Sequence, residues 1–378
     1  MSNLARLIQL FSRPLCQVTA VLVIILLLFW TLPHSSYTNV GAGTSRAIRG
    51  NRNAVKNETL GFERVFFVNL PSRPDKRDYI TLASSLLHFR PEPMNGVMPD
   101  EIDKKAYPAN WDPKYLPGEI GTWRAHMNII QRIVQDRISS AFILEDDADW
   151  DVNLKEQLHG FASASQMVQA TTGSPHSPYG DDWDLLWIGH CGVKFQAGPV
   201  HVATNDITVV PVSQLPAYWR DPPVGAGNTT RLVSRVEEGV CTLGYAVTYL
   251  GAQKLLSALS LTPEGVGAQF DVAMSRYCQN GWLKCIAPFP SLMGIWRPAG
   301  PKSRGSDIHS DDGWIEKETP VGTVYSAMFN ARRMLTGETT VHAVVENASP
   351  SELNPRLFKA PEGVLKTLDD TGLHGMSI

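Results

Sequence analysis

The chain has 378 residues, of which 43% are hydrophobic and 19% charged, a composition typical of a folded globular protein. With 34 Lys and Arg against 37 Asp and Glu, the formal net charge is -3, which excludes the basic footprint of a nucleic-acid-binding protein. The length suits one large catalytic domain or two modest ones.

The N-terminal segment favours a membrane anchor. Residues 15–32 carry no charge, and Arg6 and Arg13 precede them. Such a run has about the minimum length for a helix that crosses the hydrocarbon core, and basic residues before it indicate a cytosolic N-terminus. A cleaved signal peptide is the alternative, but the run is long for one and no small-residue cleavage site follows closely. We therefore expect a type II membrane protein with a cytosolic tail over residues 1–14.

The segment after the anchor, residues 33–60, is polar and rich in Gly, Ser and Asn, which indicates a flexible stem. We expect a catalytic domain over residues 61–331 and a C-terminal extension of uncertain role over residues 332–378. N-glycosylation sequons begin at Asn57, Asn228 and Asn347, which is consistent with a lumenal domain.

Four cysteines follow the anchor, and an even number in an oxidising compartment permits two disulfides. They are Cys191, Cys241, Cys278 and Cys285. Local spacing favours Cys278 with Cys285, which leaves Cys191 with Cys241, although the sequence does not fix the connectivity. The absence of CxxC and HxxxH spacings argues against a zinc site.

The first elements alternate between strand and helix. An apolar strand over residues 64–70 leads into a basic loop and a helix over residues 75–87. After an irregular, proline-rich stretch, a helix over residues 118–137 leads into a strand over residues 141–144. We expect an α/β fold with a mostly parallel sheet, flanked by helices, that binds ligands at the carboxyl ends of its strands.

The later elements continue this pattern less clearly. Further strands are expected over residues 183–188, 242–248 and 285–287, and helices over residues 251–259 and 270–277. A segment of about fifty residues, 192–239, is rich in Pro, Gly and Thr, and connections this long are often functional.

Three adjacent carboxylates, Glu145, Asp146 and Asp147, end the strand over residues 141–144. Their mutual repulsion is relieved by a cation, and carboxylate oxygens suit Mn²⁺ or Mg²⁺. Alternation along an extended segment points Glu145 and Asp147 to the same side, which leaves Asp146 to support the turn. A solvated acidic turn is the alternative interpretation, since acidic loops commonly follow strands.

The remaining candidates each have an ordinary structural explanation as well. The loop over residues 72–77 carries three basic residues, Arg73, Lys76 and Arg77, which could contact phosphates or a nucleotide or serve as a charged first turn. Asp271 could be a general base or a first-turn acid favoured by the helix dipole. His126 lies among apolar neighbours, where a structural histidine is the default, and His309 could complete a metal site from a late loop.

Several motifs together resemble glycosyltransferase family 25, the group of lipopolysaccharide-type and collagen galactosyltransferases. They occur in the family's order between residues 65 and about 308. The matching segments are VFFVNLPSRPDKRD (65–78), GEIGTWRAHMNIIQRIV (118–134), AFILEDDADW (141–150), LGYAVTYLGAQKLL (243–256), FDVAMSRY (270–277) and a stretch ending in Ser306-Asp307-Ile308. Trp123, Arg124 and Ala125 depart from the family pattern before His126, and the long insert suggests a fungal branch.

The resemblance implies a GT-A fold, a UDP-sugar donor and Mn²⁺ or Mg²⁺ held by Glu145 and Asp147. By the same likeness Asn69, Arg73 and Arg77 line the nucleotide pocket, with His126, Glu145 and Asp146 also assigned to donor binding, and Asp271 lies near the acceptor. The expected function is transfer of a hexose, with galactose favoured, to a glycan or glycoprotein in the Golgi or endoplasmic reticulum. The alternatives are a catalytically silent carbohydrate-binding or scaffold protein and, more distantly, a glycoside hydrolase, which needs no metal or nucleotide.

Overall fold

The computed structural model describes residues 52–216, 227–260, 268–309, 312–369 and 372–375. The predicted cytosolic tail, the predicted anchor over residues 15–32 and most of the predicted stem lie outside these residues. Within the described ranges, no helix combines the length and apolar character needed to cross a membrane. The end of the predicted stem packs on the domain, because Val55 and Leu60 are fully buried.

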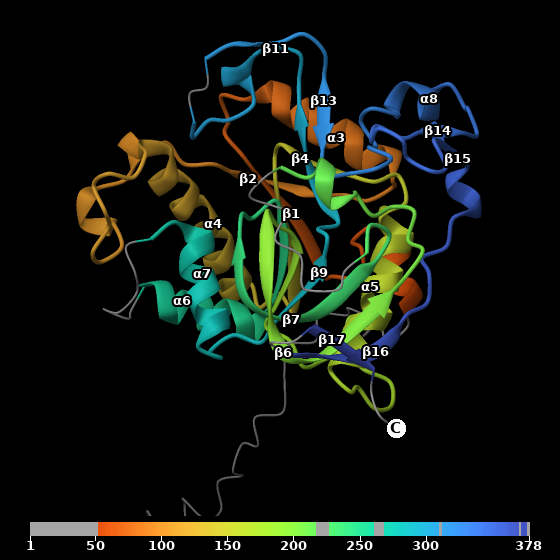
Figure 1. Cartoon of the computed structure of the whole chain (residues 1–378). Coiled ribbons are helices and arrows are strands. Elements are labelled where there is room, and N and C mark those ends of the chain that lie inside the picture. Colours follow the sequence, from red (N-terminus) through yellow and green to blue (C-terminus); the bar gives the residue numbers. More distant parts are fainter. Residues whose placement is uncertain (1–51, 217–226, 261–267, 310–311, 370–371, 376–378) are drawn as a thin grey trace, which may run out of the picture. The chain divides into compact units, whose positions relative to one another are not determined.

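Ten of the described strands form one sheet, in the order β17-β16-β6-β7-β9-β5-β8-β3-β1-β2 (Figure 1). In chain order they are β1 (Arg64–Asn69), β2 (Glu92–Asn95), β3 (Ser140–Glu145), β5 (Leu185–Gly189), β6 (Gly192–Ala203), β7 (Arg231–Val240), β8 (Gly244–Thr248), β9 (Cys285–Phe289), β16 (Val364–Asp369) and β17 (Gly372–Gly375). The strands predicted from apolar runs are all present. The segment over residues 192–239, expected as a long connection, instead supplies most of the hairpin of β6 and β7.

The sheet is mixed, so the prediction of a mostly parallel sheet was wrong. Parallel pairing is confined to β1 with β2, β1 with β3, and β5 with β9. The other neighbouring strands in this sheet pair antiparallel. The difference arises because β8 lies antiparallel between β3 and β5, and because β16 and β17, from the predicted C-terminal extension, add to the edge beside β6.

Helices cover both faces of the sheet (Figure 1). One face packs against α3 (Pro74–Leu86) and α5 (Leu154–Val168), and the other against α4 (Pro117–Gln135), α6 (Tyr249–Ser260) and α7 (Phe270–Gln279). Alternate residues of β1 divide between the two cores, with Val65 and Phe67 in one and Phe66 in the other, as the pleat of a strand requires.

The two helices nearest the predicted site begin for local reasons. Both α3 and α4 start with proline, whose fixed φ suits the first helical position and whose missing N–H is not needed there. In α4 the carboxylate of Glu119 also accepts a 2.9 Å hydrogen bond from the Leu116 N–H. These starts place the α3 and α4 N-termini beside the ends of β1 and β2.

A small sheet of β13 (Thr319–Val321), β10 (Met293–Arg297) and β4 (Ala148–Trp150) follows the acidic residues. The remaining short elements are β11 (Gly300–Pro301), β12 (Trp314–Ile315), β14 (Val341–His342), β15 (Glu352–Leu353), α8 (Ala331–Leu335) and 3₁₀ turns at Arg52–Lys56, Pro99–Glu101, Lys104–Ala106, Val212–Gln214, Lys302–Arg304 and Pro355–Leu357. β3 is paired within the large sheet and β4 is paired with β10, so the strands before and after the acidic turn are both fixed.

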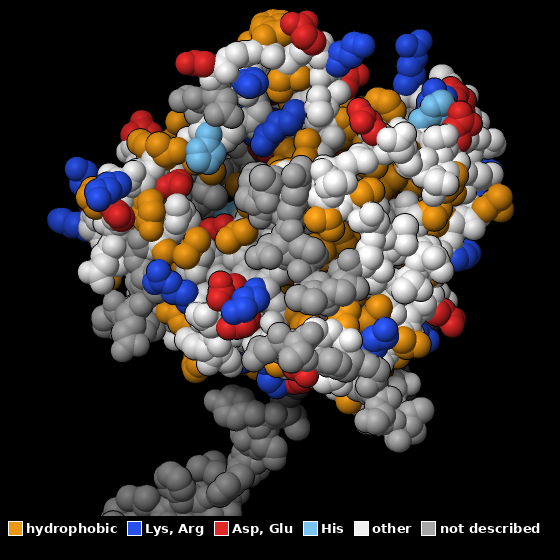
Figure 2. Space-filling view, viewed as in Figure 1, with side chains coloured by type: hydrophobic (Ala, Val, Ile, Leu, Met, Phe, Trp, Pro, Cys, Tyr) orange, Lys and Arg blue, Asp and Glu red, His pale blue; other side chains and the backbone are white. Residues whose placement is uncertain are grey.

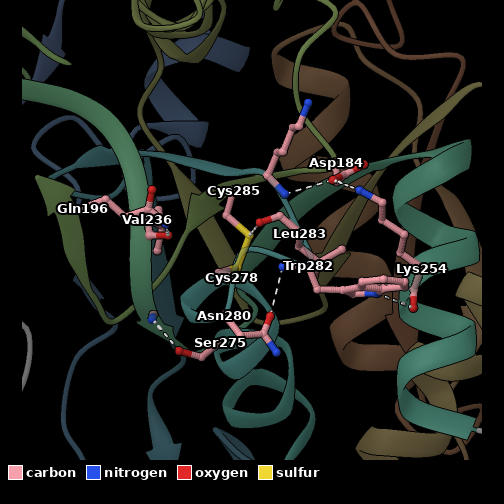
Figure 3. The surroundings of a disulfide bond; sticks show 12 residues. Asp184, Gln196, Val236, Lys254, Ser275, Cys278, Asn280, Trp282, Leu283 and Cys285 are labelled. Carbon is pink, nitrogen blue, oxygen red and sulfur yellow. Dashed lines mark hydrogen bonds and ion pairs between the residues drawn. A yellow bond between two sulfur atoms is a disulfide. The ribbon is translucent and has the colours of Figure 1, made fainter. Parts of the chain in front are cut away.

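Two disulfides are present, and the pairing favoured by spacing is confirmed. Cys278 near the end of α7 bonds Cys285 at the start of β9, and Cys191 bonds Cys241. Figure 3 shows that the first disulfide lies beside an ionic contact in which Asp184 accepts hydrogen bonds from Lys254 Nζ, at 2.6 Å, and from the Lys284 N–H. Together these links fix α7 and α6 against the sheet.

A buried ion pair joins β7 to the loop after β6. Arg231 Nε lies 2.8 Å from Asp206 Oδ2, and the side chains are 9% and 6% exposed. Burial alone would raise the pKa of Asp206, but the charge of Arg231 and hydrogen bonds from Thr208 hold that pKa below its ordinary value of 3.8. The pair therefore stabilises the folded protein fully at pH values above 3.8. This contribution is lost as the pH falls through the lower pKa that Asp206 has in the folded protein.

We predict that Arg231→Met lowers the free energy of unfolding by about 3–5 kcal/mol at neutral pH, because it leaves a buried carboxylate unpaired. The matched control is Arg235→Met on the same strand. Arg235 pairs with Asp182, which is 46% exposed, so losing this ion pair should cost about 0–1 kcal/mol. Urea unfolding at neutral and acidic pH measures both effects. The difference between Arg231→Met and the wild type should shrink in acid, and a difference that grows there would contradict this explanation.

Candidate active site

A cavity of about 450 Å³ opens where β1, β2 and β3 end. The lining residues come from the strand ends, from α3, from the N-terminal half of α4 and from the loop of residues 304–309, here called the late loop. They are Val68, Leu70, Ser72, Lys76, Gly96, Val97, Met98, Pro99, Pro117, Gly118, Gly121, Thr122, Ala125, His126, Glu145, Asp146, Asp147, Ser306, Asp307 and Ile308. This volume lies within the usual range for small-molecule sites, about 300–1,000 Å³. The mixture of glycines, apolar side chains and convergent charges is what such sites contain.

Two glycines of α4 allow the backbone to approach closely. A Cβ on Gly121 would lie 2.3 Å from the Val97 carbonyl oxygen, and one on Gly118 would lie 2.9 Å from the Ile308 Cα. Both contacts involve backbone atoms that cannot move aside easily. The glycines therefore bring the loop after β2 and the late loop against α4, where they close two sides of the cavity.

Glu145 ends β3 inside a group of negative charges. Burial and the charges of Asp147, Asp271 and Asp146 raise its pKa, while a hydrogen bond donated by the Thr242 hydroxyl opposes the shift. The carboxylates at this turn are thus held together against their own repulsion. A cation bound among them would lower that electrostatic cost.

The other two carboxylates have fixed partners. Asp146 accepts hydrogen bonds from Lys76 Nζ at 3.0 Å and Asn69 Nδ2 at 2.9 Å. Asp147 lies 3.2 Å from the guanidinium of Arg297, and its backbone carbonyl accepts a 2.9 Å bond from the Trp296 N–H. Burial raises the pKa of Asp146, and the charge of Lys76 opposes that rise. Positive charges on α3 and β10 therefore compensate the negative charge of the acidic turn from two sides.

Arg73, which precedes α3, and Lys76 in its first turn are tied to the late loop by ion pairs. Lys76 Nζ also lies 2.9 Å from Asp307 Oδ2, and Arg73 contacts both Asp307 at 2.5 Å and Asp75 at 2.8 Å. Arg73 further donates to the Arg304 carbonyl oxygen at 2.7 Å. These contacts hold the late loop over the ends of β1 and β3.

His126 lies fully buried on α4 and lines the cavity. Its Nδ1 is 3.0 Å from the Tyr245 hydroxyl, and its ring stacks on Phe270 with centroids 4.8 Å apart. Within the described part of the chain, Nε2 makes no hydrogen bond, and its nearest charged neighbour is Glu145 Oε1 at 3.8 Å. Because burial lowers the pKa of His126 to about 3, the ring is neutral at physiological pH.

Asp271, in the first turn of α7, is connected to Glu145 through two consecutive residues. The Cys241 N–H donates to Asp271 Oδ2 at 2.7 Å, and the next residue, Thr242, bonds Glu145. The disulfide to Cys191 anchors the same point of the chain. Asp271 is half-buried and is not among the residues that line the cavity, although its charge acts on Glu145.

The predicted site residues therefore occupy different places. Glu145, Asp146, Asp147 and His126 line the cavity. Asn69 is buried behind it, where its amide oxygen accepts a 3.1 Å bond from Arg77 Nε, and Arg73 lines a second, neighbouring cavity. His309 is exposed, outside the cavity lining, and its N–H donates to Ser306 Oγ at 3.1 Å.

Three residues of the site were not singled out from the sequence: Thr242, Arg297 and Asp307. Asp307 lies within the last family motif, so its position alone could have suggested it. Thr242 and Arg297 carry no such signal, because their roles depend on pairings between segments far apart in the chain.

Metal binding remains a prediction. Across the described residues, no three or more His, Cys, Asp or Glu side chains are arranged as a ready metal site. Binding of a metal ion by Glu145, Asp147 and His309 therefore stays a prediction from the sequence. The donor chemistry nevertheless fits a hard divalent cation, because two carboxylates that repel each other line one cavity. The oxygen ligands that Mn²⁺ and Mg²⁺ prefer are therefore available there.

The fold and site together define an α/β protein with an acidic ligand cavity at the carboxyl edge of its sheet. Residues 62–173 match the model of glycosyltransferase family 25, described as an LPS biosynthesis protein. The matched segment contains β1 to β4 and the acidic turn. The resemblance to this family that the motifs indicate is thereby confirmed.

Curated relatives agree with this assignment. Procollagen galactosyltransferase 1 of Danio rerio is 26% identical over 213 residues, which cover 53% of this chain and 29% of the relative. Procollagen galactosyltransferase 2 of Mus musculus is 23% identical over the same length, with 53% and 28% covered. Inactive glycosyltransferase 25 family member 3 of Homo sapiens is 22% identical over 281 residues, with 68% and 40% covered. The chain thus spans less than a third of the procollagen galactosyltransferases that it matches here.

We predict that Lys76→Met destabilises the domain by about 1–3 kcal/mol, because it leaves two carboxylates without their shared cation. The double variant Lys76→Met/Asp146→Asn should cost less than the sum of the single variants, since one of those carboxylates is then neutral. Chemical denaturation of the four proteins measures the cycle. Strict additivity would show that Lys76 and Asp146 do not interact energetically.

Proposed function

We propose that the protein transfers a hexose, with galactose favoured, from a UDP-sugar to a glycan or glycoprotein acceptor. The observation that supports this most is the cavity at the ends of β1 to β3, in which a neutral histidine, a lysine and four carboxylates converge. Open α/β sheets bind nucleotides at such strand ends, and the similarity to procollagen galactosyltransferases favours galactose. The GT-A fold implied by the motifs belongs to the same proposal.

Glu145 and Asp147 are the residues proposed to hold Mn²⁺ or Mg²⁺, with His309 as a third candidate. When bound, the ion would neutralise charge that develops on the departing nucleoside diphosphate. Lys76 lies beside the same carboxylates and adds a second positive charge near the diphosphate. The Nε2 of His126 faces this group without a protein partner in the described structure, so we assign it a hydrogen bond to a donor oxygen.

Asp271 is the proposed general base or acceptor-binding carboxylate. Its two oxygens accept hydrogen bonds from the N–H groups of Cys241 and Val272, at 2.7 and 2.8 Å, which fix the orientation of the carboxylate. It adjoins the acidic group without lining the cavity. That position suits a residue that meets the acceptor at the border of the donor site.

The proposed compartment is the lumen of the Golgi or endoplasmic reticulum, with the chain attached through residues 15–32. Two disulfides in the described domain favour an oxidising environment. The sequons beginning at Asn57, Asn228 and Asn347 are compatible with it. Figure 2 shows acidic and basic side chains interspersed on this face, without the single basic patch that a nucleic-acid partner would require.

We predict that UDP raises the thermal unfolding midpoint of the full chain only when MnCl₂ is present, by on the order of 5 °C at saturation, because ligand binds the folded state alone. Asp147→Asn should abolish the shift. The control Asp136→Asn alters an exposed carboxylate at the end of α4 and should retain it. Differential scanning fluorimetry with a panel of nucleoside diphosphates makes the measurement.

Each outcome of that experiment separates the candidates. A manganese-dependent shift specific to UDP supports the donor site. No shift with any nucleotide contradicts the proposal and favours a silent family member, as the similarity to inactive glycosyltransferase 25 family member 3 allows.

We predict that Asp271→Asn lowers kcat by about 10²–10⁴-fold while UDP binding stays unchanged, because the change removes the charge and one acceptor oxygen but keeps an oxygen that can accept the Cys241 N–H. Steady-state release of UDP from UDP-galactose with an accepting glycoprotein measures kcat, and the fluorimetric shift measures UDP binding. Normal turnover in this variant would exclude Asp271 as the base.

A further inference from the structure

A second cavity, of about 310 Å³, lies on the α3 side of the acidic turn. Lys76, Asp146 and Asp147 line both cavities, so the two are separated by one layer of side chains. The other lining residues are Arg73, Asp75, Asp78, Tyr79, Leu82, Trp296, Pro298, Arg304, Gly305 and Met328. Arg73 was expected in the nucleotide pocket, but the proposed donor site gives no role to Tyr79 and Trp296, the aromatic residues that line this cavity.

The cavity is lined by a stacked aromatic pair, Tyr79 and Trp296. The rings of Tyr79 and Trp296 lie 6.0 Å apart at 15°. The Tyr79 hydroxyl donates to the Ala148 carbonyl oxygen at 2.7 Å, and the Trp296 N–H donates to the Asp147 carbonyl oxygen at 2.9 Å. The Tyr79 hydroxyl thus fixes its ring, and the backbone bond of Trp296 fixes β10 beside the acidic turn. The Trp296 side chain is half-buried and keeps exposed surface.

The charges around the cavity disfavour an anionic ligand. Four carboxylates line it, and its three cationic side chains are Arg73, Lys76 and Arg304. Arg73 and Lys76 already form ion pairs with Asp75, Asp146 and Asp307. A phosphate would meet net negative charge there, whereas a neutral polyol could donate hydroxyl hydrogen bonds to the carboxylates.

We propose that this cavity is an acceptor subsite that binds a neutral pyranose ring, with the ring's C–H face on Trp296 and its hydroxyls toward Asp75 and Asp78. The proposal rests on the proposed function and adds to it the chemistry of the acceptor: a sugar residue next to the one that reacts. The shared side chains place that residue directly beside the donor cavity. The subsite selects acceptors that already carry a sugar.

Saturation-transfer NMR on the full chain tests this with the methyl glycosides of galactose, glucose, mannose, xylose and N-acetylglucosamine as probes. At least one glycoside should bind the wild type saturably, in the millimolar range. Trp296→Ala should weaken that binding by about tenfold or more, through loss of the aromatic face. Trp282→Ala is the matched control, because Trp282 is 48% exposed and packs near Lys254, outside both cavities.

The outcomes distinguish this proposal from the proposed function. Manganese-dependent UDP binding should be unchanged in Trp296→Ala, since the Trp296 N–H bond to Asp147 is made by the backbone. If Trp296→Ala unfolds, Trp296→Leu keeps apolar volume without the ring and gives the same test. UDP binding without glycoside binding, or glycoside binding indifferent to Trp296, overturns the subsite alone. Glycoside binding lost with Trp296 but without UDP binding upholds the subsite and overturns the donor assignment.

Discussion

The arrangement of the site depends on how the chain compensates three carboxylates at the end of one buried strand. Charges and hydrogen bonds reach Glu145, Asp146 and Asp147 from α3, from β10 and from the segment before β8. Each of these elements has a fixed position because its own packing is completed elsewhere. The electrostatic cost of the acidic turn therefore specifies how four distant parts of the chain meet.

The two faces of the sheet divide the work of the site. The face covered by α4 and α7 carries His126 and Asp271, and the face covered by α3 carries the basic loop and Tyr79. The end of β3 lies between them, so one short turn contributes to both cavities. A mixed sheet achieves this because β8, running antiparallel, brings its preceding loop to the same edge as the end of β3.

The sequence predicts local features well and long-range pairing poorly. Apolar runs located β1, β3 and β5, and periodicity located α3 and α4, because those signals are carried by neighbouring residues. The direction of β8 and the hairpin of β6 and β7 depend on contacts between distant residues, so the sheet was expected to be mostly parallel. The same limit applies to the site: the acidic triplet is visible in the sequence, whereas Thr242 and Arg297 become partners only after folding.

The link from Cys191 to Cys241 has a consequence for how the protein is produced. The residue that closes this disulfide also holds Asp271, and its neighbour holds Glu145. A chain synthesised in a reducing bacterial cytosol could reach its full helix and strand content while this junction is still open. Circular dichroism would not register the defect, so quantifying free thiols is the quality control that distinguishes a correctly matured preparation from one in which this disulfide is missing.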